Sequence, residues 1–254
     1  MSFFDIGQDW RATLVFNHII SYVFQVISSR REIVRFVQVG ANDGLNADFL
    51  NPFIISGKWK GLLVEPVPKT FEQLKANYSD VKGLIYANCA VGESDGVAKF
   101  YALCEPHSAL SSFNKDTILS HTGWALSEGL PDPADCISEI SVKLCTLESL
   151  FNEYAIDEID VLAVDTEGFD CKVVASLPKT ICPSIIFFEH CHCELQETIR
   201  MRSSLLALGY RMLFDKYNVL ATKESFLCEG LHDTFVKVVM EAGMVMDKFQ
   251  EAYG

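Results

Sequence analysis

The segment Phe36–Gly44, with the sequence FVQVGANDG, passes from a short apolar run into a turn that begins and ends with glycine. The run Phe36–Val39 has the length and composition of a buried strand, and helical apolar spacing resumes after Gly44. A glycine-flanked turn between a strand and a helix lets a ligand come close to backbone N–H groups. We therefore expect an α/β fold whose first strand ends in a ligand-binding turn.

Short apolar runs alternate with helical stretches after Arg35, which is the pattern of a mostly parallel sheet with helices on both faces. The expected strands are Phe36–Val39, Gly61–Val64, Leu84–Cys89, Val97–Leu103, Ile140–Leu144, Ile159–Val164, Ile185–Phe188, Tyr210–Phe214 and Val219–Ala221. The expected helices are Asn46–Ile55, Lys69–Tyr78, Leu147–Tyr154, Phe169–Ser176, Leu195–Leu208 and His232–Ala252. The pattern predicts an α/β fold with the sheet between two helical layers.

Apolar residues recur at helical spacing between Ala12 and Ile27, with polar residues among them. We expect an amphipathic helix that packs on the core of the domain, or on a second subunit in a homodimer. A helix on a membrane surface would carry a polar face rich in Lys and Arg, which this segment lacks. No apolar run in the chain approaches the roughly 20 residues that span a bilayer, so we expect no transmembrane segment.

We expect one domain, because the strands on both sides of the segment 105–139 must share a core. Its parts are an N-terminal helical extension at 1–33, a main body at 34–230 and a C-terminal helix at 231–254. The segment 105–139 has little periodicity and is a mixture of Pro, Gly, Ser, His and Trp. Loops this long in compact domains are usually functional or disordered, and the composition favours an active-site loop.

The composition argues against several classes of protein. The 254 residues include 34 acidic and 21 basic side chains, for a net charge of −13, so a nucleic-acid partner held by phosphate contacts is not expected. The nine cysteines are odd in number and lack the spacing of a disulfide scaffold, which indicates reduced thiols. The N-terminus has no basic region before an apolar run, so it does not resemble a signal peptide. We expect a cytoplasmic protein.

The second expected strand ends in Glu65-Pro66, with the carboxylate 25 residues beyond Gly40. Ligands of open parallel sheets bind at the carboxyl ends of the strands, and an acid at this distance accepts hydrogen bonds from two ribose hydroxyls. The turn is Gly-x-x-x-Gly and not the Gly-x-Gly-x-x-Gly that holds a pyrophosphate. A nucleoside without phosphates is therefore expected in place of a dinucleotide, which opposes a nicotinamide-dependent oxidoreductase.

Three further strand ends carry polar or small residues that would meet at the same edge of the sheet. They are Asn88, Cys89 and Ala90 after the third strand, Asp165 and Glu167 after Ile159–Val164, and Glu189 and His190 after Ile185–Phe188. An adenine ring could lie flat on the small residues of the third strand. Carboxylates directly after a buried strand are costly unless they are paired or used, so we expect the later strand ends to belong to the site.

Six motifs occur in a fixed order along the chain. They are VQVGANDG (37–44), KGLLVEPVP (60–68), NCAVGESDG (88–96), TLESLF (146–151), IDVLAVDTEGFD (159–170) and IIFFEH (185–190). Together they resemble the FkbM-type S-adenosylmethionine-dependent methyltransferases, from about Val34 to about Thr222. The resemblance implies a class I methyltransferase fold, which is Rossmann-like with three layers and has a mostly parallel seven-stranded sheet with an antiparallel last hairpin. It also implies methyl transfer to a hydroxyl of a sugar, a glycan or a secondary metabolite.

The same resemblance implies a set of cofactor-binding residues. They are Gly40, Ala41, Asn42, Asp43, Gly44, Glu65, Pro66, Asn88, Cys89, Ala90, Ser112 and Asp165. The turn after the first strand would wrap the methionine end of the cofactor, Glu65 would bind the ribose, and the residues of the third strand would border the adenine. Asp165 would lie near the sulfonium, and Ser112 with its neighbour Ser111 would cover the cofactor or the substrate.

Two positions depart from the family pattern. Many class I enzymes carry an acid where this chain has Gln38, and many family members have a lysine where it has Ala163. A catalytically degenerate methyltransferase fold that binds without turnover is therefore the alternative function, although the intact turn and Glu65 oppose it. His107, His121 and Trp124 on the long loop are candidates to contact a sugar ring, and exposed loop positions are the alternative for them.

An alcohol must lose its proton as its oxygen attacks the methyl group, so a base or a metal ion is expected. His190 with Glu189 behind it and Asp165 with Glu167 are the two candidate groups. We favour His190 as the base because imidazole titrates near neutral pH, and a structural histidine at a strand end is the alternative. A divalent cation such as Mg²⁺ on these four residues is a further hypothesis. Zinc at Glu189–Cys193 is disfavoured, since adjacent residues point in different directions.

Overall fold

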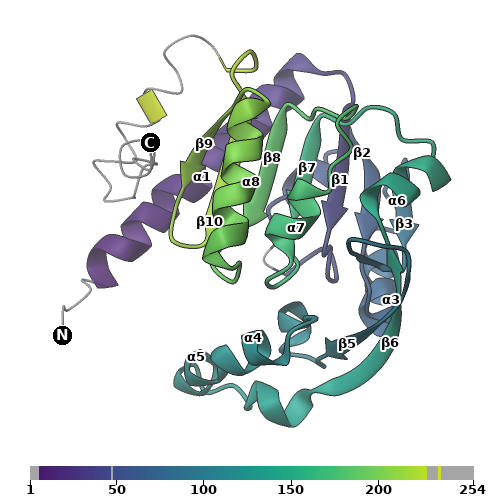
Figure 1. The fold of residues 1–254 in the computed structure, drawn as a ribbon, viewed down its shortest axis with the longest axis vertical. Coiled ribbons are helices and arrows are strands. Elements are labelled where there is room, and N and C mark those ends of the chain that lie inside the picture. The colour runs from purple at the N-terminus through teal and green to yellow at the C-terminus, as the bar shows by residue number, and fades with distance from the viewer. Residues whose placement is uncertain (1–5, 47, 228–233, 236–254) are drawn as a thin grey trace.

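The structure is a computed structural model that describes residues 6–46, 48–227 and 234–235, so nearly all of the expected C-terminal helix lies outside the described residues. A seven-stranded sheet forms its centre (Figure 1). The strands are β1 (Val34–Val39), β2 (Trp59–Val64), β3 (Leu84–Ala87), β7 (Val161–Val164), β8 (Ile185–Glu189), β9 (Tyr210–Phe214) and β10 (Asn218–Lys223). Their order is β3-β2-β1-β7-β8-β10-β9.

The sheet is mostly parallel. β1 pairs in parallel with β2 and β7, β2 with β3, and β7 with β8, whereas β10 is antiparallel to both β8 and β9. This confirms the expected seven-stranded sheet with an antiparallel last hairpin. The chain moves outward from β1 to β3 on one side and from β7 onward on the other, so the strand order reverses between β1 and β7. A reversal of this kind is where open α/β sheets bind ligands.

Helices cover both faces of the sheet, as the alternation predicts (Figure 1). The helices α1 (Ile6–Arg30), α2 (Asn51–Ile54) and α3 (Pro68–Asn77) pack on one face, and α6 (Leu147–Glu153), α7 (Asp170–Ala175) and α8 (Leu195–Ala207) pack on the other. Side chains of β1 alternate between the two cores, with Val37 and Val39 in one and Phe36 in the other. Both faces of the central strands are therefore buried.

The N-terminal helix is part of the domain core. Phe16, Ile20 and Phe24 of α1 are fully buried in the cluster that includes Phe36 and Phe187. The first of the two expected roles of the helix, packing on its own domain, is therefore confirmed. The buried apolar side chains between Phe16 and Ile27 are covered by the rest of the described chain. Within the residues that the structure describes, no helix is long and apolar enough to cross a membrane.

A second, three-stranded sheet flanks the main one. It consists of β4 (Ala90–Val91), β6 (Ser138–Cys145) and β5 (Gly96–Ala102), in that order, with β5 and β6 antiparallel. A small core of its own lies beneath it, around Phe100 and Val142. We expected strands at both β5 and β6 but placed them in the common core. Their alternating burial, with one face exposed, shows a separate layer instead.

The expected long loop at 105–139 is wrong as a structural assignment, because the segment contains regular turns. It holds the 3₁₀ turns η1 (Ser108–Leu110) and η2 (Pro133–Cys136) and the helices α4 (Lys115–Ser120) and α5 (Thr122–Ser127). Six residues are too few to show helical periodicity, which is why the sequence pattern did not predict these helices. The expected helix at Asn46–Ile55 is likewise reduced to α2. The α4–α5 segment lies opposite the carboxyl ends of the central strands (Figure 1).

Candidate functional site

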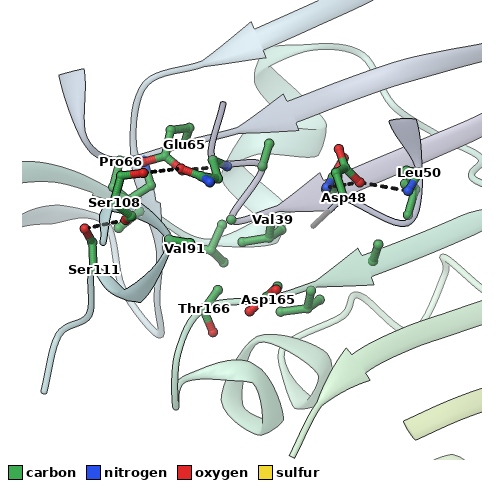
Figure 2. Close-up of a pocket in the computed structure, with 18 of the residues that line it drawn as sticks. Val39, Asp48, Leu50, Glu65, Pro66, Val91, Ser108, Ser111, Asp165 and Thr166 are labelled. Carbon is green, nitrogen blue, oxygen red and sulfur yellow. Dashed lines mark hydrogen bonds between the residues drawn. The ribbon is translucent and has the colours of Figure 1, made fainter. Parts of the chain in front are cut away.

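A pocket opens at the carboxyl ends of β1, β2 and β7, beside the reversal of strand order (Figure 2). The space between its walls, counting the part that is open to solvent, is about 970 Å³. The predicted cofactor-binding residues that line it are Gly40, Ala41, Asn42, Glu65, Pro66, Cys89, Ala90 and Asp165. Glu65 and Asp48 lie at opposite ends of the pocket, with Asp165 between them (Figure 2).

Gly40 sits where the ends of three strands converge. Its φ is +79°, and a Cβ at this position would lie 1.7 Å from the carbonyl oxygen of Asp165. The N–H groups of Gly40 and Ala41 both donate to the Val64 carbonyl, at 2.9 and 3.0 Å, and the Asp165 N–H donates to the Val39 carbonyl at 2.9 Å. The turn is thereby fixed between β2 and β7, and only glycine fits its first position.

The other end of the turn shapes the site without lining it. The Asp43 Oδ1 accepts hydrogen bonds from the N–H groups of Leu45 and Asn46, each at 2.9 Å. Gly44 has a φ of +75°, and a Cβ there would lie 2.4 Å from the ring of Tyr78, whose hydroxyl donates to the Gly44 carbonyl at 2.7 Å. The structure therefore places Asp43 and Gly44 in the support of the turn, and not in the wall of the pocket.

Glu65 is a buried carboxylate in the wall of the pocket. Its Oε2 accepts a hydrogen bond from the Asn42 N–H at 3.0 Å, and its Oε1 accepts one from the Val67 N–H at 2.9 Å. Burial raises the pKa of Glu65 to about 7, although both hydrogen bonds act to lower it. A carboxylate has about four acceptor positions, so Glu65 can accept two more hydrogen bonds from a ligand.

The third strand contributes two of its three predicted residues to the pocket. Cys89 and Ala90 line the wall, whereas the Asn88 side chain donates to the carbonyls of Glu65 and Pro66, at 2.8 and 3.1 Å. Asn88 therefore holds the backbone of the Glu65 segment in place and has no place in the lining. Burial raises the pKa of the Cys89 thiol, so this side chain presents a neutral surface.

The pocket also contains polar groups that the sequence reasoning missed. The Gln38 Nε2 donates to the Asp48 Oδ1 at 3.2 Å, and burial raises the pKa of Asp48 to about 6. The Gln38 Oε1 and the Asn42 Nδ2 are buried without a hydrogen-bond partner. Both residues line the pocket, so its wall contains one acceptor and one donor that the protein does not pair. In the sequence Gln38 stands out only as a departure from the family pattern, and Asp48 lies in a segment that carries no motif.

The 105–139 segment closes one side of the pocket (Figure 2). Ser108 and Ser111 line the wall, and the Ser108 hydroxyl donates to Glu105 Oε1 at 2.8 Å and lies 3.3 Å from Asn42 Oδ1. Ser112, the predicted cofactor contact, is instead buried with its hydroxyl donating to the Glu167 carbonyl at 2.7 Å. Of the neighbours Ser111 and Ser112, Ser111 therefore lies at the pocket, and Ser112 supports the turn after β7.

The turn after β7 presents Asp165 to the pocket. The carboxylate of Asp170 accepts hydrogen bonds from the Thr166 N–H and hydroxyl, each at 3.0 Å, and from the Gly168 N–H at 3.2 Å. Asp170 therefore orders this turn. Asp165 is exposed to the pocket, yet desolvation by the surrounding protein raises its pKa, and the negative charges of Glu167 and Glu189 raise it further. The Asp165 carboxyl group itself is accessible from the pocket.

His190, the predicted base, points elsewhere. Its Nε2 lies 3.0 Å from the Asp215 carbonyl, its ring packs edge-on against Phe214 at 5.6 Å between centroids, and it does not line the pocket. Glu189 does not back it, because side chains of adjacent residues leave a strand on opposite faces. The Glu189 carboxylate lies with those of Asp165 and Glu167, within 4.8 Å. The position of His190 thus fits the alternative, a structural histidine at a strand end.

One family model matches more than half of the chain. Residues 38–212 match the model of the methyltransferase FkbM domain. Among solved structures, a methyltransferase FkbM from Methylobacillus flagellatus KT aligns with a TM-score of 0.46 and 13% identity, over 75% of this chain and 44% of that chain. The present chain therefore spans less than half the length of that protein. No curated protein sequence matches the chain.

Two further solved structures, a methyltransferase and a protein with bound S-adenosyl-L-methionine, also align with the chain. A precorrin-6y C5,15-methyltransferase from Geobacter metallireducens GS-15 aligns with a TM-score of 0.42 and 8% identity, over 82% of this chain and 87% of that chain. Fibrillarin from Aeropyrum pernix, with natively bound S-adenosyl-L-methionine, aligns with a TM-score of 0.39 and 10% identity, over 75% of this chain and 66% of that chain. Since the FkbM domain model covers more than half of its residues, the chain belongs to the FkbM family of methyltransferases.

Proposed function

We propose that this chain is an S-adenosylmethionine-dependent O-methyltransferase that acts on a hydroxyl of a sugar, a glycan or a secondary metabolite. The observation that carries the proposal is Glu65, a buried carboxylate fixed by two backbone N–H groups in the wall of the pocket at the reversal of strand order. An acid in this position suits the two hydroxyls of a ribose. Membership of the FkbM family supplies the reaction class, and the cofactor follows from it.

The pocket offers a partner for each part of the cofactor. The ribose hydroxyls would donate to Glu65, and the adenine would lie against Cys89 and Ala90. The ammonium of the methionine end requires acceptors, which the unpaired Gln38 Oε1 supplies. The carboxylate of that end requires a donor, and the unpaired Asn42 Nδ2 is one. The glutamine at the position of the usual acid therefore retains an acceptor for the cofactor.

Methyl transfer is an in-line displacement, so alignment of donor and acceptor contributes most of the catalysis. The acceptor oxygen forms a bond to the methyl carbon as the bond from carbon to sulfur breaks, and the hydroxyl proton passes to a base. Asp165 is the base in this proposal, because its carboxyl group lines the pocket. The imidazole of His190 is held at the Asp215 carbonyl, and Glu189, although within 4.8 Å of Asp165, does not line the pocket.

The affinity for S-adenosylmethionine is expected to fall as the pH drops below about 7. Glu65 accepts hydrogen bonds from the ribose best as a carboxylate. Because its pKa is about 7, Glu65 of the ligand-free protein becomes increasingly protonated as the pH falls below 7. The dissociation constant should rise towards tenfold per pH unit between about pH 7 and about pH 5.5. Calorimetric titration at each pH measures it.

The variant Glu65→Gln separates this effect from other titrating groups, such as Asp48. The variant cannot ionise at this position. The part of the pH dependence of the dissociation constant that is due to Glu65 should therefore disappear. An unchanged slope in the variant would contradict the assignment.

The proposed reaction is tested by release of S-adenosylhomocysteine in the presence of a panel of sugars, sugar nucleotides and phenols. Turnover by the wild-type protein and a loss of at least about tenfold in Asp165→Asn would support it. Binding of S-adenosylmethionine without turnover on any acceptor would favour the degenerate binding protein. The described cysteines are all free thiols, which is in keeping with the predicted cytoplasmic location.

A further inference from the structure

Four side chains of metal-ligating types, from three segments, meet near Asp165. His121 lies at the junction of α4 and α5, Glu167 in the turn after β7, and Glu189 and His192 at and after the end of β8. The Nε2 atoms of His121 and His192 lie 3.5 and 3.6 Å from the Glu167 Oε2. The His192 Nε2 lies 3.9 Å from the Glu189 Oε2. All four side chains therefore point towards one small region of the molecule.

These atoms are buried but not used by the protein. The His121 Nε2, the Glu167 Oε2 and the Glu189 Oε2 are each buried without a hydrogen-bond partner. Their separations exceed the roughly 2.7–3.2 Å of a hydrogen bond. A buried carboxylate oxygen without a partner is unfavourable. Two such oxygens beside an unpaired imidazole nitrogen therefore indicate a missing positive group.

The separations match those around a metal ion. Nitrogen and oxygen ligands lie about 2.0–2.2 Å from a tetrahedral zinc ion, which places neighbouring ligand atoms about 3.4 Å apart. The observed separations of 3.5 and 3.6 Å are close to this value. Two imidazoles with carboxylates suit a transition metal, whereas Mg²⁺ prefers oxygen ligands alone. The chemistry of the donors therefore selects the class of ion.

We propose that His121, Glu167 and His192 bind a divalent first-row transition-metal ion such as Zn²⁺ or Mn²⁺. Glu189 lies beside this site, with its Oε2 3.9 Å from the His192 Nε2. This site differs from the Mg²⁺ site considered from the sequence, because His190 takes no part and two other histidines supply the nitrogen ligands. It also differs from a zinc site within Glu189–Cys193, since the ligands come from separate segments. Ser112 supports it by fixing the backbone of Glu167.

The site adjoins the pocket, and its role rests on the proposed function. Carboxylate oxygens of Asp165, Glu167 and Glu189 lie within 4.8 Å of one another, and Asp165 lines the pocket. None of the four side chains lines the pocket, so an ion held by them would act on an acceptor in the pocket through Asp165. His121 comes from the segment that closes the pocket, so the ion would also join that segment to the central sheet.

Metal binding is tested without activity, on the full chain after treatment with a chelator and removal of the chelator. Titration with Mn²⁺, followed by the loss of the free-ion signal in electron paramagnetic resonance, should show one bound ion per chain. Calorimetry with Zn²⁺ should agree, and Mg²⁺ should bind more weakly than Mn²⁺. The variants His192→Ala and Glu167→Gln should each weaken Mn²⁺ binding by at least about tenfold.

The control is His18→Ala, which removes an exposed histidine on α1. This variant should bind Mn²⁺ like the wild-type protein. If His192→Ala does not fold, Glu167→Gln still tests the site, because it preserves the volume of the side chain. Equal Mn²⁺ affinity in Glu167→Gln and wild type, or the absence of a stoichiometric site, would overturn the proposal. S-adenosylmethionine binding is measured in the same samples. A wild-type protein that binds Mn²⁺ but not S-adenosylmethionine would count against the methyltransferase assignment and not against the metal site.

Discussion

Replacing Glu65 by alanine is expected to weaken the binding of S-adenosylmethionine by at least about 100-fold. Two hydrogen bonds from ribose hydroxyls to a carboxylate would be lost, and each is worth roughly 1.5–3 kcal/mol. The N–H groups of Asn42 and Val67, which donate to Glu65, would lose their partner as well. Calorimetric titration of the purified variant measures the change.

A matched control is Glu72→Ala, because Glu72 is an exposed glutamate on α3 that pairs only with Lys75 at the surface in the described structure. It should bind the cofactor as tightly as the wild-type protein. The variant Glu65→Gln keeps the size of the side chain and should lose about tenfold in affinity, since it removes the charge and one acceptor. Normal affinity in Glu65→Ala would rule out the ribose assignment.

The substitution Gly40→Ala is expected to destabilise the protein by about 2–5 kcal/mol. A non-glycine residue at a left-handed φ costs about 1–2 kcal/mol, and Gly40 has a φ of +79°. The new Cβ would also lie 1.7 Å from the Asp165 carbonyl, so the ends of β1 and β7 must separate, which adds about 1–3 kcal/mol. Denaturant-induced unfolding measures the loss, and cofactor binding should be lost with it.

Gly57→Ala isolates the contribution of the backbone conformation. Gly57 has a φ of +81°, similar to that of Gly40, but no atom lies within 4 Å of the position that a Cβ would take there. It should therefore cost only about 1–2 kcal/mol and leave the pocket unchanged. Equal losses of stability in the two variants would contradict the account of Gly40 as the point of close contact between β1 and β7.

The central sheet could be predicted because its strands are buried on both faces and appear in the sequence as uninterrupted apolar runs. The two faces of β1 pack into different cores, which requires the apolar composition of Phe36–Val39. The helices α4 and α5 could not be predicted, since each has six residues and neither spans two turns. The small second sheet was missed because strand patterns do not reveal which strands pair.

The part of the site that follows a strand directly could be predicted from the sequence, and Gly40, Glu65 and Asp165 are where the strand ends placed them. The assignment of His190 as the base depends on the direction of its side chain, which the amino-acid sequence alone does not determine. His121 could not be assigned to the neighbourhood of Glu167, because 46 residues separate them in the chain and the contact forms only through the α4–α5 segment.

The central claim is that the pocket beside Gly40 and Glu65 binds S-adenosylmethionine, and calorimetric titration of the wild-type chain tests it most directly. The account predicts one S-adenosylmethionine bound per chain and no binding of NAD, since the turn lacks the glycine pattern that holds a pyrophosphate. Binding of NAD in place of S-adenosylmethionine, or no binding of S-adenosylmethionine by a correctly folded chain, would contradict it.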